Sequence, residues 1–187
     1  MNSQDKKIIL YFISIFISFL SVIIYMNYQI GNPILPTEGT VKDSFVRTAD
    51  VDKKEIFLTM ADIRNYPNII QGNYISVNII NDTNGTIYAE EEVQDMGIRT
   101  KMLVKHILVP YDKHIMTILD GDAKGSTITE IFEENGSYTR LTTNVDVHIH
   151  GILSPFASLT KSNLDSAVNT IILKFVEYTK NEHARYP

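Results

Sequence analysis

Much of this chain alternates apolar and polar residues with a period of two, from Tyr74 to Gly151. Such alternation predicts β-strands with one apolar face. Clusters rich in Asn, Asp, Gly and Pro separate the runs at residues 81–85, 95–97, 110–112, 121–122 and 134–136, and each is short enough for a hairpin. The predicted strands are residues 74–80, 87–93, 98–109, 114–119, 126–133 and 140–150. Consecutive hairpins form an antiparallel sheet, whose apolar face needs cover.

Residues 154–180 are the longest stretch with helical periodicity, and they provide that cover. The apolar stripe recurs at spacings of four and three, and it comprises Leu164, Val168, Ile171, Phe175 and Tyr178, widened by Ala167 and Ile172. The opposite flank is polar and comprises Lys161, Asp165, Asn169, Lys174 and Glu177. An amphipathic helix of this length is expected to lie against the sheet.

The segment before the hairpins predicts one strand and two short helices. Residues 40–48 alternate well enough for a first strand. Asp50 or Asp52 is expected to cap a helix that ends near Ala61. Residues 62–70 predict a second, short helical turn that Pro67 breaks.

Residues 8–26 carry no charge and match the roughly 20 residues that cross a ~30 Å hydrocarbon core as a helix. Lys6 and Lys7 precede this run and no basic residue follows until Lys42, so the amino terminus is predicted to be cytoplasmic. A cleaved signal peptide is the alternative, but the run exceeds the usual h-region and no small-x-small site ends it. Three serines on one face predict possible self-association: Ser14, Ser18 and Ser21.

The predicted organisation has five parts. They are a cytoplasmic tail (1–7), a transmembrane helix (8–26), a linker rich in Pro and Gly (27–39), an extracytoplasmic domain (40–181) and a short C-terminal tail (182–187).

Composition and motifs exclude several function classes. A net charge of -5 with no cluster of Lys and Arg argues against nucleic-acid binding. The chain has no cysteine, which excludes disulfides and thiolate chemistry. It also lacks the glycine-rich phosphate loop, the Gly-x-Ser-x-Gly motif and the His-Glu-x-x-His motif. No cofactor is predicted.

The order of elements and one local segment resemble the START-like, helix-grip superfamily. Met60-Ala61-Asp62 followed by Ile63-Arg64-Asn65-Tyr66-Pro67 is similar to that superfamily's "aDv.rYP" segment. The superfamily, also called SRPBCC, includes polyketide cyclase/dehydrase and coenzyme Q-binding proteins. The resemblance covers about residues 40–180. It implies an α+β fold in which a curved antiparallel sheet of about seven strands wraps a long C-terminal helix.

The resemblance also implies a deep cavity between sheet and helix for an apolar molecule such as a lipid, quinone, sterol or polyketide. The residues expected to contact this ligand are Met60, Tyr66, Met102, Val104, His106, Met116, Leu164, Val168, Ile171 and Phe175. Because the superfamily shares a shape and no common catalytic motif, it does not fix the function.

Two titratable residues are predicted to point inward. His106 shares its side of a strand with Met102, Val104 and Leu108, so it could contact a ligand or transfer a proton. The alternative is a structural histidine satisfied by a neighbouring strand or a buried carboxylate. Glu91 is the inward candidate among three consecutive glutamates, and it could pair with His106, act as a base, or splay to solvent.

Two further patterns concern the surface. Asn144, Asp146, His148 and His150 alternate along the last strand, and the last three are weak candidates for a zinc site. Because Val145, Val147 and Ile149 form the apolar side, the polar set is expected on the outer surface.

Three sequons in predicted turns are glycosylation candidates, at Asn81, Asn84 and Asn135.

The leading hypothesis is a membrane-anchored domain that binds or carries a hydrophobic small molecule. The alternatives are an enzyme of the cyclase/dehydrase type, in which Glu91 and His106 move protons, and a membrane-bound interaction scaffold with a collapsed cavity.

Overall fold

The structure is a computed structural model that describes residues 39–95, 98–151 and 161–185. All of them belong to the unit Glu38–Pro187. The predicted span 8–26, its three serines and the linker up to residue 38 lie outside the described residues. Within the described ranges, no helix is both long enough and apolar enough to cross a bilayer.

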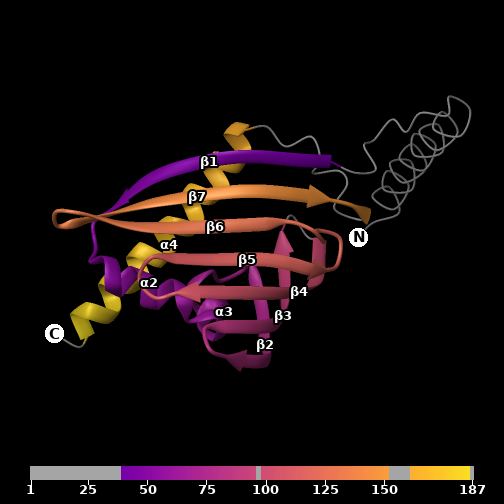
Figure 1. Cartoon of the computed structure of the whole chain (residues 1–187), viewed down its shortest axis with the longest axis horizontal. Coiled ribbons are helices and arrows are strands. Elements are labelled where there is room, and N and C mark those ends of the chain that lie inside the picture. The colour runs from indigo at the N-terminus through magenta and orange to yellow at the C-terminus, as the bar shows by residue number, and fades with distance from the viewer. Residues whose placement is uncertain (1–38, 96–97, 152–160, 186–187) are drawn as a thin grey trace, which may run out of the picture. The chain divides into compact units, whose positions relative to one another are not determined.

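One antiparallel sheet of seven strands runs through the fold in the order β1-β7-β6-β5-β4-β3-β2 (Figure 1). The strands are β1 (Gly39–Ala49), β2 (Tyr74–Thr83), β3 (Thr86–Asp95), β4 (Ile98–Val109), β5 (Lys113–Asp120), β6 (Thr127–Asn135) and β7 (Tyr138–Ile149). Strands β2 to β7 are each hydrogen-bonded to the next, which confirms the predicted series of hairpins. β1 pairs with β7, so the first and the last strand of the sequence lie side by side, with β1 at the edge of the sheet.

The connection between β1 and β2 contains the short helices α2 (Lys53–Ala61), η1 (Ile63–Asn65) and α3 (Tyr66–Ile69). The carboxylate of Asp52 accepts hydrogen bonds from the backbone N–H groups of Lys54 and Glu55, so it is the N-cap of α2. The prediction that Pro67 breaks the second helix is wrong. Pro67 lies in the first turn of α3, where its missing N–H would have no helical partner anyway.

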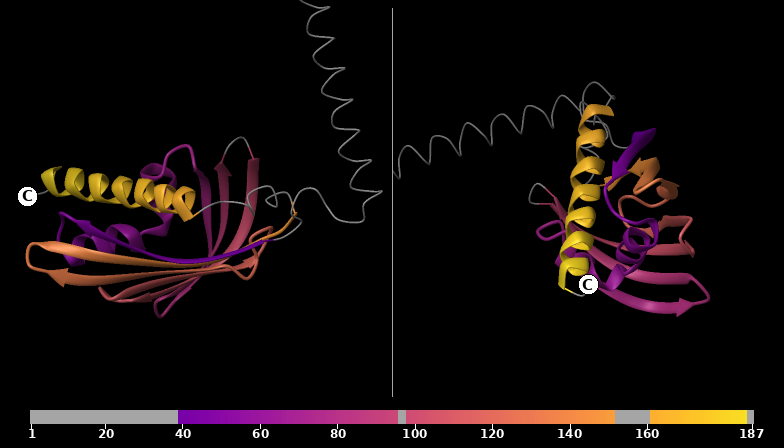
Figure 2. Two further views of the ribbon diagram at one scale, coloured as in Figure 1. Left: turned by 90° about the horizontal axis from the view of Figure 1, so that it is seen from above. Right: turned by 90° about the vertical axis from the view of Figure 1, so that its left-hand side faces the viewer.

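The long helix α4 (Lys161–Arg185) lies along one face of the sheet, and the sheet curves around that face (Figure 2). It continues five residues beyond the predicted end at residue 180, because Glu182, Ala184 and Arg185 are all compatible with a helix. Residues 152–160, which include the predicted start at 154, lie outside the described residues.

The buried stripe of α4 is rotated relative to the prediction. Ile172, Phe175 and Thr179 are buried, whereas Ile171 is 37% exposed. Thr179 enters the stripe because its hydroxyl donates to the Phe175 carbonyl and lies 2.9 Å from the Thr59 hydroxyl of α2, so its polar group is satisfied.

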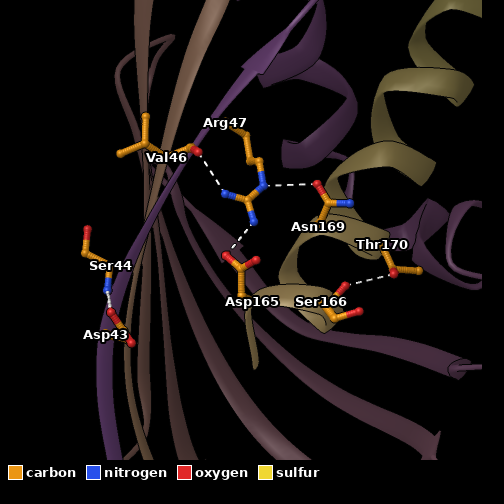
Figure 3. Close-up of polar contacts among 8 residues, drawn as sticks. All are labelled: Asp43, Ser44, Val46, Arg47, Asp165, Ser166, Asn169 and Thr170. Carbon is orange, nitrogen blue, oxygen red and sulfur yellow. Dashed lines mark hydrogen bonds and ion pairs between the residues drawn. The ribbon is translucent and has the colours of Figure 1, made fainter. Parts of the chain in front are cut away.

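Arg47 of β1 links the edge strand to α4 (Figure 3). Its Nη2 lies 2.5 Å from Oδ1 of Asp165, and its Nε donates to Oδ1 of Asn169 at 3.0 Å. The helical periodicity placed Asp165 and Asn169 on the polar flank opposite the apolar stripe. They instead face β1, because the strand that covers this flank comes from the far end of the sequence.

The hairpin between β2 and β3 is tighter than the predicted turn at 81–85. Thr83 pairs with Thr86, which leaves only Asn84 and Gly85 in the loop. Both have positive φ angles, 51° and 74°, as a type I′ turn requires. A Cβ atom on Gly85 would lie 2.9 Å from the Leu108 carbonyl oxygen, so this position needs glycine.

Candidate functional site

A cavity of about 180 Å³ lies between α4 and the sheet. Its wall is almost entirely apolar. The lining residues are Tyr66, Ile70, Tyr74, Met116, Ile128, Glu130, Thr143, Val145, Val147, Leu164, Ala167, Val168, Ile171, Ile172 and Phe175. They come from α3, the loop that follows it, strands β2, β5, β6 and β7, and helix α4. The cavity is therefore assembled from segments that are far apart in the sequence.

A more open groove of about 480 Å³ adjoins the cavity. The two share four wall residues: Ile70, Tyr74, Ala167 and Ile171. The groove adds polar side chains from α4 and from the start of β2, among them Asn73 and Asn163. This arrangement gives the cavity a polar-rimmed approach beside α4.

Two tyrosines, the buried Tyr66 and the half-buried Tyr74, supply polar atoms to the cavity wall. The Tyr66 hydroxyl donates to the Met60 carbonyl at 2.7 Å. The Tyr74 hydroxyl is hydrogen-bonded to Glu91. Burial is the largest cause that raises the pKa of both phenols well above 10, and the negative charges of Glu130 and Glu91 add to it. Both side chains therefore remain protonated donors.

Behind the cavity wall, four titratable side chains form a buried chain. Nε2 of His106 lies 2.9 Å from Oε1 of Glu91, and Nδ1 of His106 lies 3.0 Å from Nε2 of His114. Nδ1 of His114 lies 3.2 Å from Oε2 of Glu130. All four residues are at most 6% exposed. Only Glu130 lines the cavity, so it is the end of the chain that a ligand would meet.

Strand pairing explains how the chain forms. His114 and Glu130 are direct partners across β5 and β6, and His106 pairs with Met116, which places His106 diagonally from His114. The two imidazole rings are stacked with centroids 5.2 Å apart. Glu91 pairs with Met102, and its side chain reaches along the sheet to His106.

The contact between His114 and Glu130 is close without being a hydrogen bond. Nδ1 of His114 and Oε2 of Glu130 are both buried and both lack a hydrogen-bond partner. A buried polar atom without a partner costs about 1–3 kcal/mol, so such atoms are rare in folded proteins. This unsatisfied pair, with Glu130 in the cavity wall and His114 behind it, is a feature that core packing does not explain.

The structure separates the predicted ligand contacts into two sets. The cavity wall contains Tyr66, Met116, Leu164, Val168, Ile171 and Phe175. The others are outside this wall: Met60, Met102, Val104 and His106. Met60 instead packs in the core cluster with Ile56 and Phe57, because α2 lies between the end of α4 and the sheet.

Glu91 and His106 are both buried, as their strand patterns predicted, and they contact each other. Neither lines the cavity, so a role for either in contact with a ligand stays a prediction. His114 and Glu130 were not among the residues predicted from the sequence. The signal for Glu130 was present in the pattern, because this acid lies between Ile128 and Phe132 on the inward side of β6.

The predicted metal candidates do not converge. Asp146 pairs with Lys42 at 2.8 Å and with His148 at 3.2 Å, whereas β7 ends at Ile149, before His150. The Lys42 hydrogen bond is the main cause that lowers the pKa of Asp146. Among the residues that the structure describes, no group of three or more His, Cys, Asp or Glu side chains is arranged to hold a metal ion.

The sequon asparagines are exposed. Asn84 lies in the β2–β3 turn, and Asn135 is the last residue of β6. The prediction that all three occupy turns is wrong for Asn135, which pairs with Tyr138, and for Asn81. This residue lies inside β2, where it pairs with Tyr88, because the strand continues three residues further than its apolar pattern.

A curved seven-stranded antiparallel sheet, short helices after the first strand and a long C-terminal helix over an apolar cavity define the START-like helix-grip fold. The protein has this fold, as the sequence resemblance implied.

Solved structures with the same fold agree with this assignment. The protein TTHA0849 of Thermus thermophilus is 11% identical, with a TM-score of 0.66 over 76% of this chain and 99% of that one. The Zhui aromatase/cyclase of Streptomyces sp. R1128 is 14% identical, with a TM-score of 0.61 over 78% and 94% of the two chains. Major latex-like protein 151 of Panax ginseng is 14% identical, with a TM-score of 0.54 over 77% and 97%.

No family model and no curated protein matches the sequence. At the identities above, the likeness to the solved structures concerns the fold.

Proposed function

We propose that this protein binds a hydrophobic small molecule in the cavity between α4 and the sheet. The observation that carries this proposal is the cavity wall, which is apolar except for two tyrosines, one threonine and one glutamate. A concave apolar surface with a few placed polar groups is typical of small-molecule sites. The structural similarity to an aromatase/cyclase supports the same type of ligand.

The dimensions limit how the ligand lies. An apolar cavity of about 150 Å³ holds one benzene molecule, so the 180 Å³ cavity accommodates one ring or a short chain. A lipid, quinone, sterol or polyketide is larger, and its remainder would extend into the adjoining groove of about 480 Å³. We therefore expect the ligand to bind with its buried end against β6 and its other end between α4 and the β2 side of the sheet.

The uncharged run at residues 8–26 supports a membrane location for this binding domain, with the domain on the extracytoplasmic side. A flexible linker of about a dozen residues has an end-to-end distance of roughly 20 Å. The domain would thus stay close to a bilayer, from which it takes, or to which it delivers, its ligand. A protease added outside intact cells should digest the domain, and protection would contradict this orientation.

The binding proposal is tested by native mass spectrometry of the full chain released from detergent micelles, followed by extraction and identification of any co-purifying molecule. Val168→Trp places a large ring in the cavity and should abolish ligand retention. Leu173→Trp is the matched control, because Leu173 is on the same helix and is 57% exposed. Equal retention by both variants, or none by the unmodified chain, would refute binding in this cavity and favour the scaffold hypothesis.

A second candidate function is an enzyme of the cyclase/dehydrase type. The buried chain from Glu91 through His106 and His114 to Glu130 favours it, since hydrogen-bonded imidazoles can relay protons. In this case Glu130 would contact the substrate, and Glu91 and His106 would act through it. Glu91→Gln and His106→Gln should then retain the ligand and lose turnover, and unchanged turnover would exclude this function.

A further inference from the structure

The polar end of the cavity restricts the chemistry of the ligand, and this inference rests on the proposed binding function. Glu130 lines the cavity and is 6% exposed. Its Oε2 atom is buried 3.2 Å from Nδ1 of His114 and has no hydrogen-bond partner. The cavity wall thus includes a carboxyl group among apolar side chains, and a ligand group that reaches this carboxyl group can donate a hydrogen bond to it.

Charge counting shows that this end of the cavity is negative. The 3.0 Å contact between ring nitrogens of His106 and His114 needs one donor and one acceptor, so the two rings cannot both be imidazolium. At most one positive charge can therefore stand against the two carboxyl groups of Glu91 and Glu130. Within the described residues, the basic side chains in contact with Glu91 and Glu130 are these two histidines, without lysine or arginine.

The two neighbouring tyrosines lie in the same negative electrostatic environment. The carboxylates of Glu130 and Glu91 add to the effect of burial in disfavouring the phenolate forms of Tyr66 and Tyr74. An anionic group on a ligand would meet the same burial and the same charges at this position.

We propose that the ligand is an apolar molecule that ends in one uncharged or cationic hydrogen-bond donor, a hydroxyl or an amine, and that Glu130 accepts a hydrogen bond from it. A ligand that ends in a carboxylate or a phosphate is excluded from this end of the cavity. The hydrogen bond to a buried carboxylate both satisfies Glu130 and fixes which end of the ligand enters first.

The test uses four probes of nearly equal size that fit the cavity: benzyl alcohol, benzylamine, toluene and benzoate. Their dissociation constants for the full chain in phosphatidylcholine nanodiscs are measured by ligand-observed NMR, with empty nanodiscs as the blank. A hydrogen bond to a charged group corresponds to roughly tenfold or more in affinity. Benzyl alcohol and benzylamine should therefore bind at least about tenfold more tightly than benzoate.

Glu130→Gln keeps the shape of the side chain and removes its charge. The ratio of the dissociation constant of benzoate to that of benzyl alcohol or benzylamine should therefore fall to within about threefold. Glu133→Gln is the matched control on the same strand. It should leave this ratio of dissociation constants unchanged, because the Glu133 side chain is 53% exposed and pairs with Arg140. Far-UV circular dichroism checks that each variant is folded. The order of the four probe affinities for the unmodified chain tests the ligand class without any variant.

The outcomes separate the two proposals. Failure of all four probes to bind would overturn the binding function itself. Binding that Val168→Trp abolishes, with benzoate as tight as benzyl alcohol, would overturn the donor-ended ligand and leave the binding function standing. A preference that persists in Glu130→Gln would overturn the assignment to Glu130.

Discussion

Truncation of Phe175 tests whether α4 is held on the sheet as the structure shows. Phe175 is 2% exposed and contacts Tyr66 edge to face, with ring centroids 5.3 Å apart. Phe175→Ala removes roughly 130 Å² of buried apolar surface, worth about 3 kcal/mol at 25 cal/mol per Å². Loss of the aromatic pair adds about 1 kcal/mol. The expected loss in the free energy of unfolding is therefore about 4 kcal/mol, within the range for large-to-small changes in cores.

Urea unfolding of the full chain in detergent micelles, followed by far-UV circular dichroism, measures this loss. Leu173→Ala is the control on the same helix, and it should change the free energy of unfolding by less than about 0.5 kcal/mol because Leu173 is exposed. A loss below about 1.5 kcal/mol for Phe175→Ala would contradict the buried position of Phe175, since truncation of a buried phenylalanine to alanine costs about 3–5 kcal/mol.

Three further predictions concern other parts of the fold. Arg47→Ala should lower the free energy of unfolding by about 1 kcal/mol in the same urea assay, a modest value because Asp165 is 46% exposed and solvent screens the pair. Arg47→Lys should recover only part of it, and full recovery would contradict a role for the guanidinium fork. Gly85→Ala should cost about 1–3 kcal/mol, since φ is +74° and the new Cβ would crowd the Leu108 carbonyl; an unchanged urea midpoint would refute this strain. Tyr74 has a pKa raised well above 10.0 by burial, so its contribution to stability is full below about pH 10 and is lost as the pH rises towards the folded-state pKa. Tyr74→Phe should therefore flatten the fall of stability above pH 10, and an equally steep fall would show that Tyr74 is not the group responsible.

Local sequence signals predicted most of the secondary structure. The hairpin strands were found because alternation and turn residues act over a few neighbouring positions, as Asn84 and Gly85 illustrate. The errors occurred where a distant segment decided the outcome. Ile171 and Ile172 both fit an apolar stripe, and only the position of the sheet under α4 determined that Ile172 is the buried one.

By itself, the sequence determined the α+β class, the order of elements and the inward direction of His106, and it made Glu91 the inward candidate among three glutamates, because side chains alternate along a strand whatever its partners are. Only the tertiary structure decided that His106 contacts His114 and that Glu130 is the member of this buried row of side chains that lines the cavity. These contacts depend on the register of four strands and on the curvature of the sheet, which are properties of segments brought together from across the chain.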